Sequence, residues 1–473
     1  MIFSASSLRR GDPSGRPLGR LARFLRFGRG IVGRAAIGRA AIGRAAIGRA
    51  IGSPLLLLGL MVFGAAAQEP ALRVDAGQPL GAISPYVLGA NYGPWALVSV
   101  DMTPAAAESG VTHLRFPAGR HGDTHGFTRQ QLDLFMLQAR AWGAVPSVSV
   151  RLEGGTPEEA AEMVRYANLE KGYDIRHWSI GNEPDLYVDY TIERLNAEWR
   201  ATAEAMLAVD PDIVLIGPEV SQFPYTPEGN TYTNLRREWV RAFLEANGDL
   251  VDIVAVHRYP FPLSMSSPPT TVEDLRQNAP QWDVVIDNLR TVIRETVGHD
   301  MPMALTEISS NWSHVIGGEA SPDSFYHAIW WADVLGRMIR QRVEVVDYFM
   351  FATLGSDGSF GLISRYEVRP TYYVYPLYRR LGSELIASES PDPDVTITAA
   401  LRDDGALTLI VVNRAPDARA YPLALSGFTP AGDAEVWRLD AEHNAEPVEP
   451  LVLADGAVLE LPAQSVTLYV LPQ

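Results

Sequence analysis

Between about residues 86 and 365, short apolar runs alternate with longer stretches in which apolar residues recur at helical spacing. The runs are nearly continuous, which is typical of strands buried on both faces of a parallel sheet. Between them helices are expected; in residues 156–162, for example, Thr156 is a candidate N-cap, Pro157 suits the first helical position and Glu159 completes a capping box. The runs expected to form strands are residues 87–91, 113–116, 146–150, 177–180, 213–216, 253–256, 303–306 and 346–350.

Eight strand-helix units indicate an α/β fold, and most directly a closed (β/α)8 TIM barrel over residues 86–370. An open, doubly wound sheet is the alternative. No glycine-rich phosphate loop follows the first expected strand, so a dinucleotide-binding fold is disfavoured.

Beyond residue 370 the apolar residues recur at a period of two, which indicates half-buried strands. Turns rich in Gly, Pro, Asn and Asp separate them, so residues 371–473 are expected to form a C-terminal all-β sandwich. Residues 68–85 contain the strand-like segment Ala71–Asp75 and are expected to join that sandwich. The candidate strands of the sandwich are residues 395–398, 406–412, 434–437, 457–461 and 465–470.

Residues 1–67 have the features of a basic leader and signal peptide. The first 53 residues hold 11 arginines and a single acid, Asp12, which gives a formal charge of +10. An apolar segment follows and ends in Ala65-Ala66-Ala67, so cleavage is expected before Gln68. The mature protein is then secreted or periplasmic. An uncleaved anchor is the alternative, but the apolar core is shorter than the roughly 20 residues that span a bilayer, so no stable membrane span is expected after cleavage.

The remainder of the chain is strongly acidic. The whole chain carries −16 and the first 53 residues +10, which leaves −26 for the rest. Such a field repels nucleic acids and highly sulfated polyanions, and it favours a neutral or weakly acidic ligand. The chain has no cysteine, so disulfides and thiolate metal sites are excluded.

Two glutamates follow apolar strands in the same manner. The strand at 177–180 runs into Asn182-Glu183-Pro184, and Pro184 cannot continue a sheet ladder, so the carboxylate lies at the strand's C-terminal end. The strand at 303–306 delivers Glu307 before a polar segment. The 124 positions from 183 to 307 fit about three strand-helix units of roughly 40 residues each. Both carboxylates are therefore expected at one barrel mouth.

Two carboxyl groups at one mouth are what cleavage of a glycosidic bond with retention requires, because one must donate a proton while the other stays ionised and attacks. Glu183 follows a strand containing Trp178 and Ile180, a partly apolar setting that favours its protonated form. It is expected to be the general acid and then the base. Glu307 is expected to be the nucleophile, held by donors from Arg115 and Tyr259.

The chain resembles retaining glycoside hydrolases of the (β/α)8 clan whose catalytic glutamates follow strands four and seven. The resemblance implies that Asn182, Arg115, His257 and Tyr259 bind substrate. Among families with a trailing sandwich, residues 181–187 are most similar to the β-glucuronidase and heparanase group; the β-xylosidase and arabinofuranosidase groups are alternatives. The motifs that carry the resemblance are Asn182-Glu183-Pro184, Thr306-Glu307, Arg115-Phe116-Pro117 and His257-Arg258-Tyr259.

Aromatic residues near the glutamates are candidate sugar platforms. Trp312, five positions after Glu307, is expected to stack on a sugar ring, and Trp95 is either a second platform or an ordinary rim residue. Strand eight continues as Phe349-Met350-Phe351-Ala352, without the Trp that many clan members have there.

Several polar residues have more than one interpretation. Glu219 and Glu153, after strands five and three, are rival carboxylates, substrate-binding groups or solvated loop acids. Arg115 alternatively ties down a strand end. His257 alternatively is a buried histidine without a catalytic role.

No metal or other cofactor is expected. His121 and His125 have i, i+4 spacing, but a third ligand is not apparent and residues 121–123 are expected to be a loop. Asn311-Trp312-Ser313 fits a glycosylation sequon, but a glycan there would block the nucleophile, so the match is interpreted as chance.

The sequence thus predicts a secreted retaining β-glycoside hydrolase that acts on oligo- or polysaccharides by double displacement. A non-catalytic carbohydrate-binding protein and a transglycosylase are the alternatives. Residues 224–234 and 261–271 are expected to wall the mouth. The sugar, the linkage, exo or endo action and the oligomeric state stay open.

Overall fold

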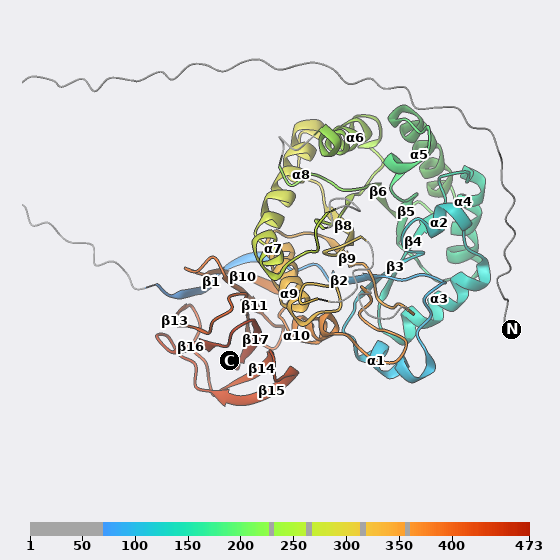
Figure 1. Ribbon diagram of the computed structural model, residues 1–473. Coiled ribbons are helices and arrows are strands. Elements are labelled where there is room, and N and C mark those ends of the chain that lie inside the picture. Colours follow the sequence, from blue (N-terminus) through green and yellow to red (C-terminus); the bar gives the residue numbers. More distant parts are fainter. Residues whose placement is uncertain (1–69, 227–230, 262–266, 313–317, 355–359) are drawn as a thin grey trace, which may run out of the picture. The chain divides into compact units, whose positions relative to one another are not determined.

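The computed structural model describes residues 70–226, 231–261, 267–312, 318–354 and 360–473 (Figure 1). The expected leader and signal peptide at 1–67 lie outside these residues, as do parts of the expected mouth walls at 224–234 and 261–271. Within the described ranges, no helix is both long and apolar enough to cross a membrane.

Eight parallel strands close into a barrel in their order along the chain, which confirms the predicted (β/α)8 fold (Figure 1). All eight predicted strands are present, and β6 extends furthest beyond its expected end. The strands are β2 (Tyr86–Asn91), β3 (His113–Phe116), β4 (Val145–Val150), β5 (His177–Ile180), β6 (Val214–Val220), β7 (Ile253–Arg258), β8 (Met303–Ile308) and β9 (Val345–Tyr348).

Helices surround the barrel (Figure 1). In α4 the predicted capping box is present, because Thr156 and Glu159 each accept the other's backbone N–H. The α-helices are α1 (Thr103–Glu108), α2 (His121–His125), α3 (Arg129–Ala141), α4 (Pro157–Val164), α5 (Ile192–Leu207), α6 (Thr231–Asn247), α7 (Val272–Asn278), α8 (Gln281–Val297), α9 (Phe325–Arg340) and α10 (Val374–Tyr378). Shorter helical segments are η1 (Val100–Met102), η2 (Arg165–Glu170), η3 (Pro184–Leu186) and η4 (Pro370–Tyr373).

The barrel interior has an apolar floor beneath a polar layer. The floor is a buried cluster that includes Ala255, Ala304 and Val345. Side chains two residues apart on a strand share a face, so the residues two positions further along point the same way. These are His257, Thr306 and Asp347, and all three are buried. The strand pattern itself thus stacks polar groups toward the C-terminal mouth.

The second domain is a nine-stranded mixed sheet that curls into the predicted sandwich, in the order β15-β14-β17-β12-β11-β10-β1-β13-β16. β1 precedes the barrel in sequence yet pairs antiparallel with β10 and parallel with β13 (Figure 1). Its strands are β1 (Leu72–Ala82), β10 (Glu384–Glu389), β11 (Val395–Leu401), β12 (Leu407–Asn413), β13 (Arg419–Ser426), β14 (Ala434–Leu439), β15 (Asn444–Leu451), β16 (Val458–Leu461) and β17 (Ser465–Leu471).

The sequence pattern did not predict β10, β13 or β15. β13 contains Pro422, and β15 contains Pro447 and Pro450, residues that lack a backbone N–H for the ladder. β15 lies at the edge of the sheet, where an unmade ladder bond is tolerated. Its side chains are mostly exposed, so it lacks the apolar alternation that marks half-buried strands.

A buried ion-pair network joins α9 to the sheet. Asp333 on α9 forms an ion pair with Arg414, whose Nε lies 2.7 Å from Oδ2, and accepts a hydrogen bond from Thr396 Oγ1, also at 2.7 Å. Arg337, one turn further along α9, pairs with the same carboxylate at 3.2 Å. Burial opposes ionisation of Asp333, but the surrounding arginines outweigh it and lower its pKa. The charged carboxylate therefore holds the sheet against the barrel's helical layer.

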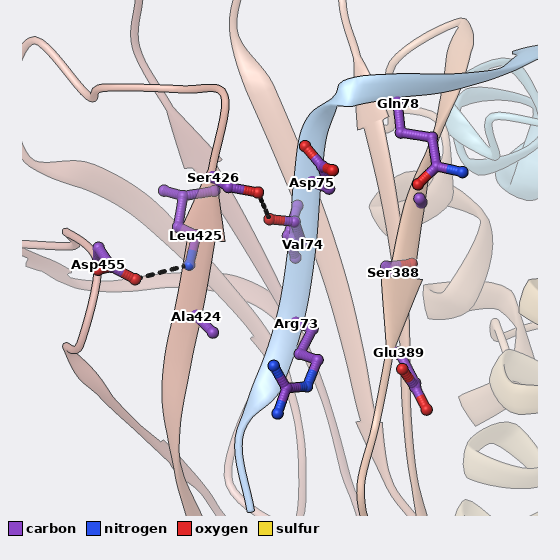
Figure 2. A pocket seen from close by; sticks show the side chains of 11 residues that line it. Arg73, Val74, Asp75, Gln78, Ser388, Glu389, Ala424, Leu425, Ser426 and Asp455 are labelled. Atoms are coloured by element: carbon purple, nitrogen blue, oxygen red, sulfur yellow. Dashed lines mark hydrogen bonds between the residues drawn. The ribbon is translucent and has the colours of Figure 1, made fainter. Parts of the chain in front are cut away.

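A pocket of about 710 Å³ lies on the sheet over β1, β10 and β13 (Figure 2). Arg73 stands between Glu389 and Ala424 in the strand register, and Asp75 stands between Ala387 and Ser426. Asp75 accepts from the N–H of Gly77 at 3.1 Å. The lining is mostly polar, with the aliphatic residues Val74 and Leu425 and two alanines, and it contains no aromatic ring.

Candidate active site

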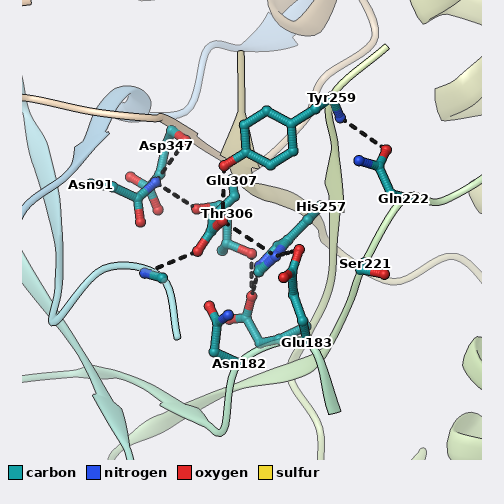
Figure 3. A network of polar contacts seen from close by, with 12 residues as sticks. Asn91, Asn182, Glu183, Ser221, Gln222, His257, Tyr259, Thr306, Glu307 and Asp347 are labelled. Carbon is teal, nitrogen blue, oxygen red and sulfur yellow. Dashed lines mark hydrogen bonds and ion pairs between the residues drawn. The ribbon is translucent and has the colours of Figure 1, made fainter. Parts of the chain in front are cut away.

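The two predicted catalytic glutamates meet at the barrel mouth (Figure 3). Glu307 belongs to β8, and Glu183 directly precedes η3, whose first residue is Pro184. One carboxylate oxygen of each lies within 4.8 Å of the other, and a ring nitrogen of His257 lies within the same distance of both. A bound of 4.8 Å between these oxygens is compatible with the roughly 5–5.5 Å between carboxyl groups of retaining glycosidases, and it is below the roughly 6.5–9.5 Å of inverting ones.

The backbone at Glu183 is shaped to project its side chain. Its φ is 50°, in the left-handed region that non-glycine residues seldom adopt, and its N–H donates to the carbonyl of Glu219 at 3.0 Å. Glu219 also has a positive φ, of 61°. Such conformations persist only where surrounding contacts fix them and are concentrated at functional sites.

Glu307 accepts hydrogen bonds at both carboxylate oxygens. Arg115 Nη1 and the backbone N–H of Gly119 each donate to Oε1 at 3.0 Å, and the Tyr259 hydroxyl donates to Oε2 at 2.8 Å. The residue is only 4% exposed. Three donors stabilise the ionised form of the carboxylate and fix its orientation. The structure thus brings Arg115 and Tyr259 to Glu307, as the sequence predicted.

Arg115 is the central cation of the site. Besides Glu307, its guanidinium donates to Asn91 Oδ1 and Asn182 Oδ1, at 3.0 Å each, and lies 3.5 Å from Glu219. Burial acts to lower its pKa, but the charges of Glu219 and Glu307 outweigh burial and raise it. Arg115 therefore stays protonated and is more than a tie for a strand end.

Glu219 lies buried beneath the two glutamates at the mouth. It accepts from Ser179 Oγ at 2.5 Å, from His257 Nε2 at 2.7 Å and from the Thr306 hydroxyl. Burial raises the pKa of a carboxyl group, but Arg115, His257 and Ser179 outweigh it and lower the pKa of Glu219 to about 2. Glu219 is thus a buried anion that orients its neighbours, and the interpretation as a solvated loop acid is wrong.

His257 connects the buried anion to the mouth. Its Nδ1 lies 3.2 Å from Glu183 Oε1 and 3.7 Å from Glu307 Oε2, and its Nε2 bonds to Glu219. Burial acts to lower its pKa, but the three carboxylates outweigh burial and raise the pKa to about 10. An imidazolium therefore faces the carboxyl groups of both Glu183 and Glu307.

Tyr259 is fully desolvated beside two carboxylates. Burial and then the charges of Glu307 and Glu183 raise its pKa well above 10, so its hydroxyl keeps its proton. A protonated phenol is neutral, so Tyr259 donates a hydrogen bond to Glu307 and adds no second negative charge beside it.

Asn182 is held by its backbone and one amide atom. Its N–H donates to Asp123 Oδ2 at 2.7 Å, and its Oδ1 accepts from Arg115. Asp123 also accepts from the Leu152 N–H at 2.8 Å and from the Tyr187 hydroxyl, so one carboxylate ties together the segments after β3, β4 and β5. Asn182 Nδ2 is buried and has no hydrogen-bond partner among the described residues. That donor is available to a ligand.

The expected apolar setting of Glu183 is not what the structure shows. Trp178 and Ile180 belong to the core between strands and helices, whereas Ser179, on the opposite face of β5, contacts Glu219. The nearest partner of Glu183 is the charged ring of His257. The side chain of Glu183 therefore lies in a polar, charged environment and not in an apolar one.

Both tryptophans considered as sugar-stacking residues are partly exposed, and a third aromatic ring lies near Glu307. Trp312 follows β8 and is 42% exposed, and Trp95 follows β2 and is 39% exposed. Phe349, after β9, packs edge-on against Tyr259 with ring centroids 6.1 Å apart. A Cβ built on Gly119 would lie 3.6 Å from the Phe349 ring and 4.0 Å from Glu307 Oε1. Phe349 is therefore an aromatic ring beside Glu307 that was not predicted from the sequence.

Other candidates lie apart from the two glutamates. Glu153 pairs with Arg120 at 2.9 Å, with both side chains substantially exposed. His121 and His125 belong to α2, so the expectation of a loop at 121–123 is wrong. Asn311, the first residue of the sequon, is 0% exposed, and its Nδ2 donates to Ser310 Oγ at 2.9 Å.

Glu183, His257 and Glu307 are close enough together to resemble a metal-binding group. The donor set does not fit a cation, because His257 is held protonated by three carboxylates and a protonated imidazole has no free lone pair. Arg115 adds a second positive charge beside Glu307.

Gly119, Asp123 and Phe349 lie at the site but were not predicted from the sequence to do so. Gly119 acts through its backbone, which no side-chain pattern reveals. Asp123 bonds to residues about 30 to 64 positions away. The aromatic character of strand eight was the available signal for Phe349.

No protein-family model matches the chain, and no curated protein matches its sequence. Among solved structures, an α-L-arabinofuranosidase of family 51 from Bifidobacterium longum is 16% identical with a TM-score of 0.68, over 85% of this chain and 99% of that chain. A bifunctional glucanase-xylanase from a metagenome library is 18% identical with a TM-score of 0.66, over 86% of this chain and 100% of that one. A family 44 xyloglucanase from Paenibacillus polymyxa is 16% identical with a TM-score of 0.66, over 85% of this chain and 99% of that chain. The fold shared with these proteins spans both the barrel and the sheet.

Proposed function

We propose that the protein is a retaining glycoside hydrolase in which Glu307 is the nucleophile and Glu183 the general acid and base. The observation that carries the proposal is the pairing of two carboxyl groups, within 4.8 Å of one another, in unlike surroundings. Glu307 has three hydrogen-bond donors on an almost fully buried carboxylate. Glu183 is more open, with a side chain 20% exposed, and has His257 as its charged neighbour.

In the first step, a carboxylate oxygen of Glu307 attacks the anomeric carbon while the bond from that carbon to the leaving oxygen breaks. Glu183 donates its proton to that oxygen, so the leaving group departs as an alcohol and an ester joins the sugar to Glu307. Oε1 of Glu307 carries two of the three donors, which leaves Oε2 the less encumbered oxygen for the attack. The imidazolium of His257 stabilises the carboxylate that Glu183 becomes.

In the second step, the Glu183 carboxylate takes a proton from water while the water oxygen attacks the anomeric carbon. The ester bond to Glu307 breaks and both side chains return to their starting forms. Two inversions give net retention.

The charges at the site favour a neutral sugar. Arg115 is 0% exposed and already paired with Glu307 and Glu219, so it does not offer a spare charge to a uronate. The structural neighbours include a glucanase-xylanase, a xyloglucanase and an arabinofuranosidase, which act on neutral sugars by their names. A glucan or pentosan substrate is therefore proposed ahead of the glucuronide that residues 181–187 indicated. Secretion or a periplasmic location, from the leader, remains a proposal alongside it.

A panel of aryl β-glycosides, with an aryl α-L-arabinofuranoside added, tests the function. The wild type is expected to release the phenol from at least one member, and Glu307→Ala is expected to abolish release. Glu153→Gln is the matched control. It also removes a carboxylate that follows a barrel strand, β4, but this carboxylate pairs with Arg120 and not with Arg115. Saccharide binding without turnover across the whole panel would contradict the proposal and favour a binding protein.

A further inference from the structure

Three aromatic side chains form a ledge at the rim of the barrel mouth: Trp95, after β2, and His121 and His125, of α2. The rings of Trp95 and His121 have centroids 4.7 Å apart. The rings of His121 and His125 are also 4.7 Å apart and nearly parallel, at 16°. Trp95 is 39% exposed and His125 is exposed, so the rim ledge presents aromatic surface to solvent.

The rim ledge is rigidly mounted. The Trp95 ring packs against the Cα of Gly93. An added Cβ at Gly93 would come within 2.3 Å of the ring, so a larger residue there would displace it. Ala96, the next residue after Trp95, is 2% exposed and packs in a buried cluster with Met350 and Phe360. An exposed tryptophan whose backbone and underside are both fixed loses little freedom on binding a ligand.

The rim ledge is continuous with the catalytic centre along two routes. His121 follows Gly119, the backbone donor to Glu307, by two residues, so their Cα atoms are within about 7 Å. On the other route, Phe349 packs against the cluster that contains Ala96, and its ring lies beside Gly119. The ring beside Glu307 and the backbone next to Trp95 therefore share one buried cluster.

The barrel order decides which part of a saccharide would follow that path. Phe349 follows β9 and Trp95 follows β2, and these two strands come directly after β8, which carries Glu307, around the closed barrel. β5, which precedes Glu183, is four strands from β9, three from β2 and two from β3, so by strand order Phe349 and Trp95 lie nearer to Glu307 than to Glu183. The leaving group must lie near the acid that protonates it. The sugars on the other side of the cleaved bond then extend toward the rim ledge.

We propose that the rim ledge is a second sugar subsite, which binds the unit that precedes the sugar attacked by Glu307. The apolar CH face of a pyranose stacks on the indole of Trp95, and the imidazoles of His121 and His125 bond to its hydroxyls. Burial and the neighbouring His125 lower the pKa of His121, so its ring is neutral at neutral pH and offers both a donor and an acceptor.

This subsite defines the substrate class. An enzyme with such a subsite acts on chains and leaves at least two sugars on the nucleophile's side of the cut, so it does not trim single units from chain ends. The inference rests on the proposed glycoside hydrolase function.

The test compares substrates that reach the rim ledge with substrates that do not. The 4-nitrophenyl β-glycosides of xylose and glucose fill only the sugar position at Glu307, whereas those of xylobiose and cellobiose extend by one unit. Trp95→Ala is expected to lower kcat/KM for the two disaccharide substrates by about tenfold and for the monosaccharide substrates by less than about twofold. Leu97→Ala is the matched control, because Leu97 is 44% exposed on the same loop and is outside the ledge; it is expected to lower neither.

Equal losses on both substrate classes, or no loss on either, would overturn the subsite. Calorimetric titration of xylotetraose and cellotetraose into Glu183→Gln, with and without Trp95→Ala, separates this result from a failure of the proposed function. If the tetrasaccharides bind in a manner that depends on Trp95 but the protein hydrolyses no substrate, the result would support a sugar-binding site at the rim ledge and contradict the proposed hydrolase function. Hydrolysis that does not depend on Trp95 would support the hydrolase and overturn the subsite. If the protein showed no binding and no hydrolysis, both proposals would be overturned.

Discussion

Replacing Glu219 by Gln tests the electrostatic core of the site without touching the two groups proposed to react with substrate. Glu219 is 0% exposed and interacts with Arg115 and His257. Its pKa falls from 4.5 to about 2 in the folded protein, since Arg115, His257 and Ser179 together outweigh burial. At about 1.4 kcal/mol per pKa unit, the preference for the carboxylate contributes about 3 kcal/mol to stability at pH 7.

The sign of the pH dependence follows from the direction of the shift. A carboxyl group whose pKa is lowered on folding stabilises the protein fully above its unfolded pKa, here 4.5, and this contribution disappears as the pH falls through about 2. Glu219→Gln is therefore expected to lower the free energy of unfolding by about 3 kcal/mol at pH 7, and the difference from wild type is expected to narrow to about 1 kcal/mol at pH 3.

Urea titrations of both proteins at pH 7, 4 and 3 measure this difference. Glu153→Gln is the control, because the Arg120–Glu153 pair is substantially exposed and such pairs contribute about 0–1 kcal/mol. A loss below about 1 kcal/mol at pH 7, or a difference that does not change with pH, would refute the assignment of Glu219 as a buried, charge-paired anion.

Three further changes probe the groups around the substrate. Glu183→Ala is expected to lower kcat by about 10²–10⁴-fold on aryl glycosides with poor leaving groups and much less on dinitrophenyl glycosides, and added azide is expected to restore turnover as a glycosyl azide; no rescue would argue against its role as base. Tyr259→Phe removes the 2.8 Å donor to Glu307 and is expected to lower kcat/KM by about 10–100-fold with little change in Tm, whereas unchanged kinetics would contradict that role. Because folding raises the pKa of His257 from 6.5 to about 10, its contribution to stability is complete below pH 6.5 and is lost as the pH rises through 10. Urea titrations should therefore show wild type losing stability between pH 7 and 10 and His257→Asn losing less, and parallel losses would exclude the charged form.

The barrel was predictable because its strands are buried on both faces and read as continuous apolar runs. Glu183 and Glu307 were predictable for a related reason, since each stands where such a run ends. The partners of Glu307 followed from the same rule, because Arg115 and Tyr259 stand at or just beyond the ends of β3 and β7.

What sequence patterns left open depends on contacts between distant segments. The role of Glu219 could not be read from its position after a strand, because its burial arises from Ser179 and Thr306 on other strands. The surroundings of Glu183 were predicted wrongly because Trp178 and Ile180 face the helices, whereas Ser179 on the other face of β5 points into the barrel. In the sheet, β15 escaped prediction because an exposed edge strand with prolines carries little apolar alternation.

Covalent trapping tests the central claim most directly. A 2-deoxy-2-fluoro glycoside with a good leaving group, matched to the sugar that the wild type hydrolyses, should inactivate the enzyme and add one sugar mass to the peptide that contains Glu307. Label on Glu219, Glu153 or Glu183, or an active enzyme that acquires no label and releases a product of inverted configuration, would contradict the account.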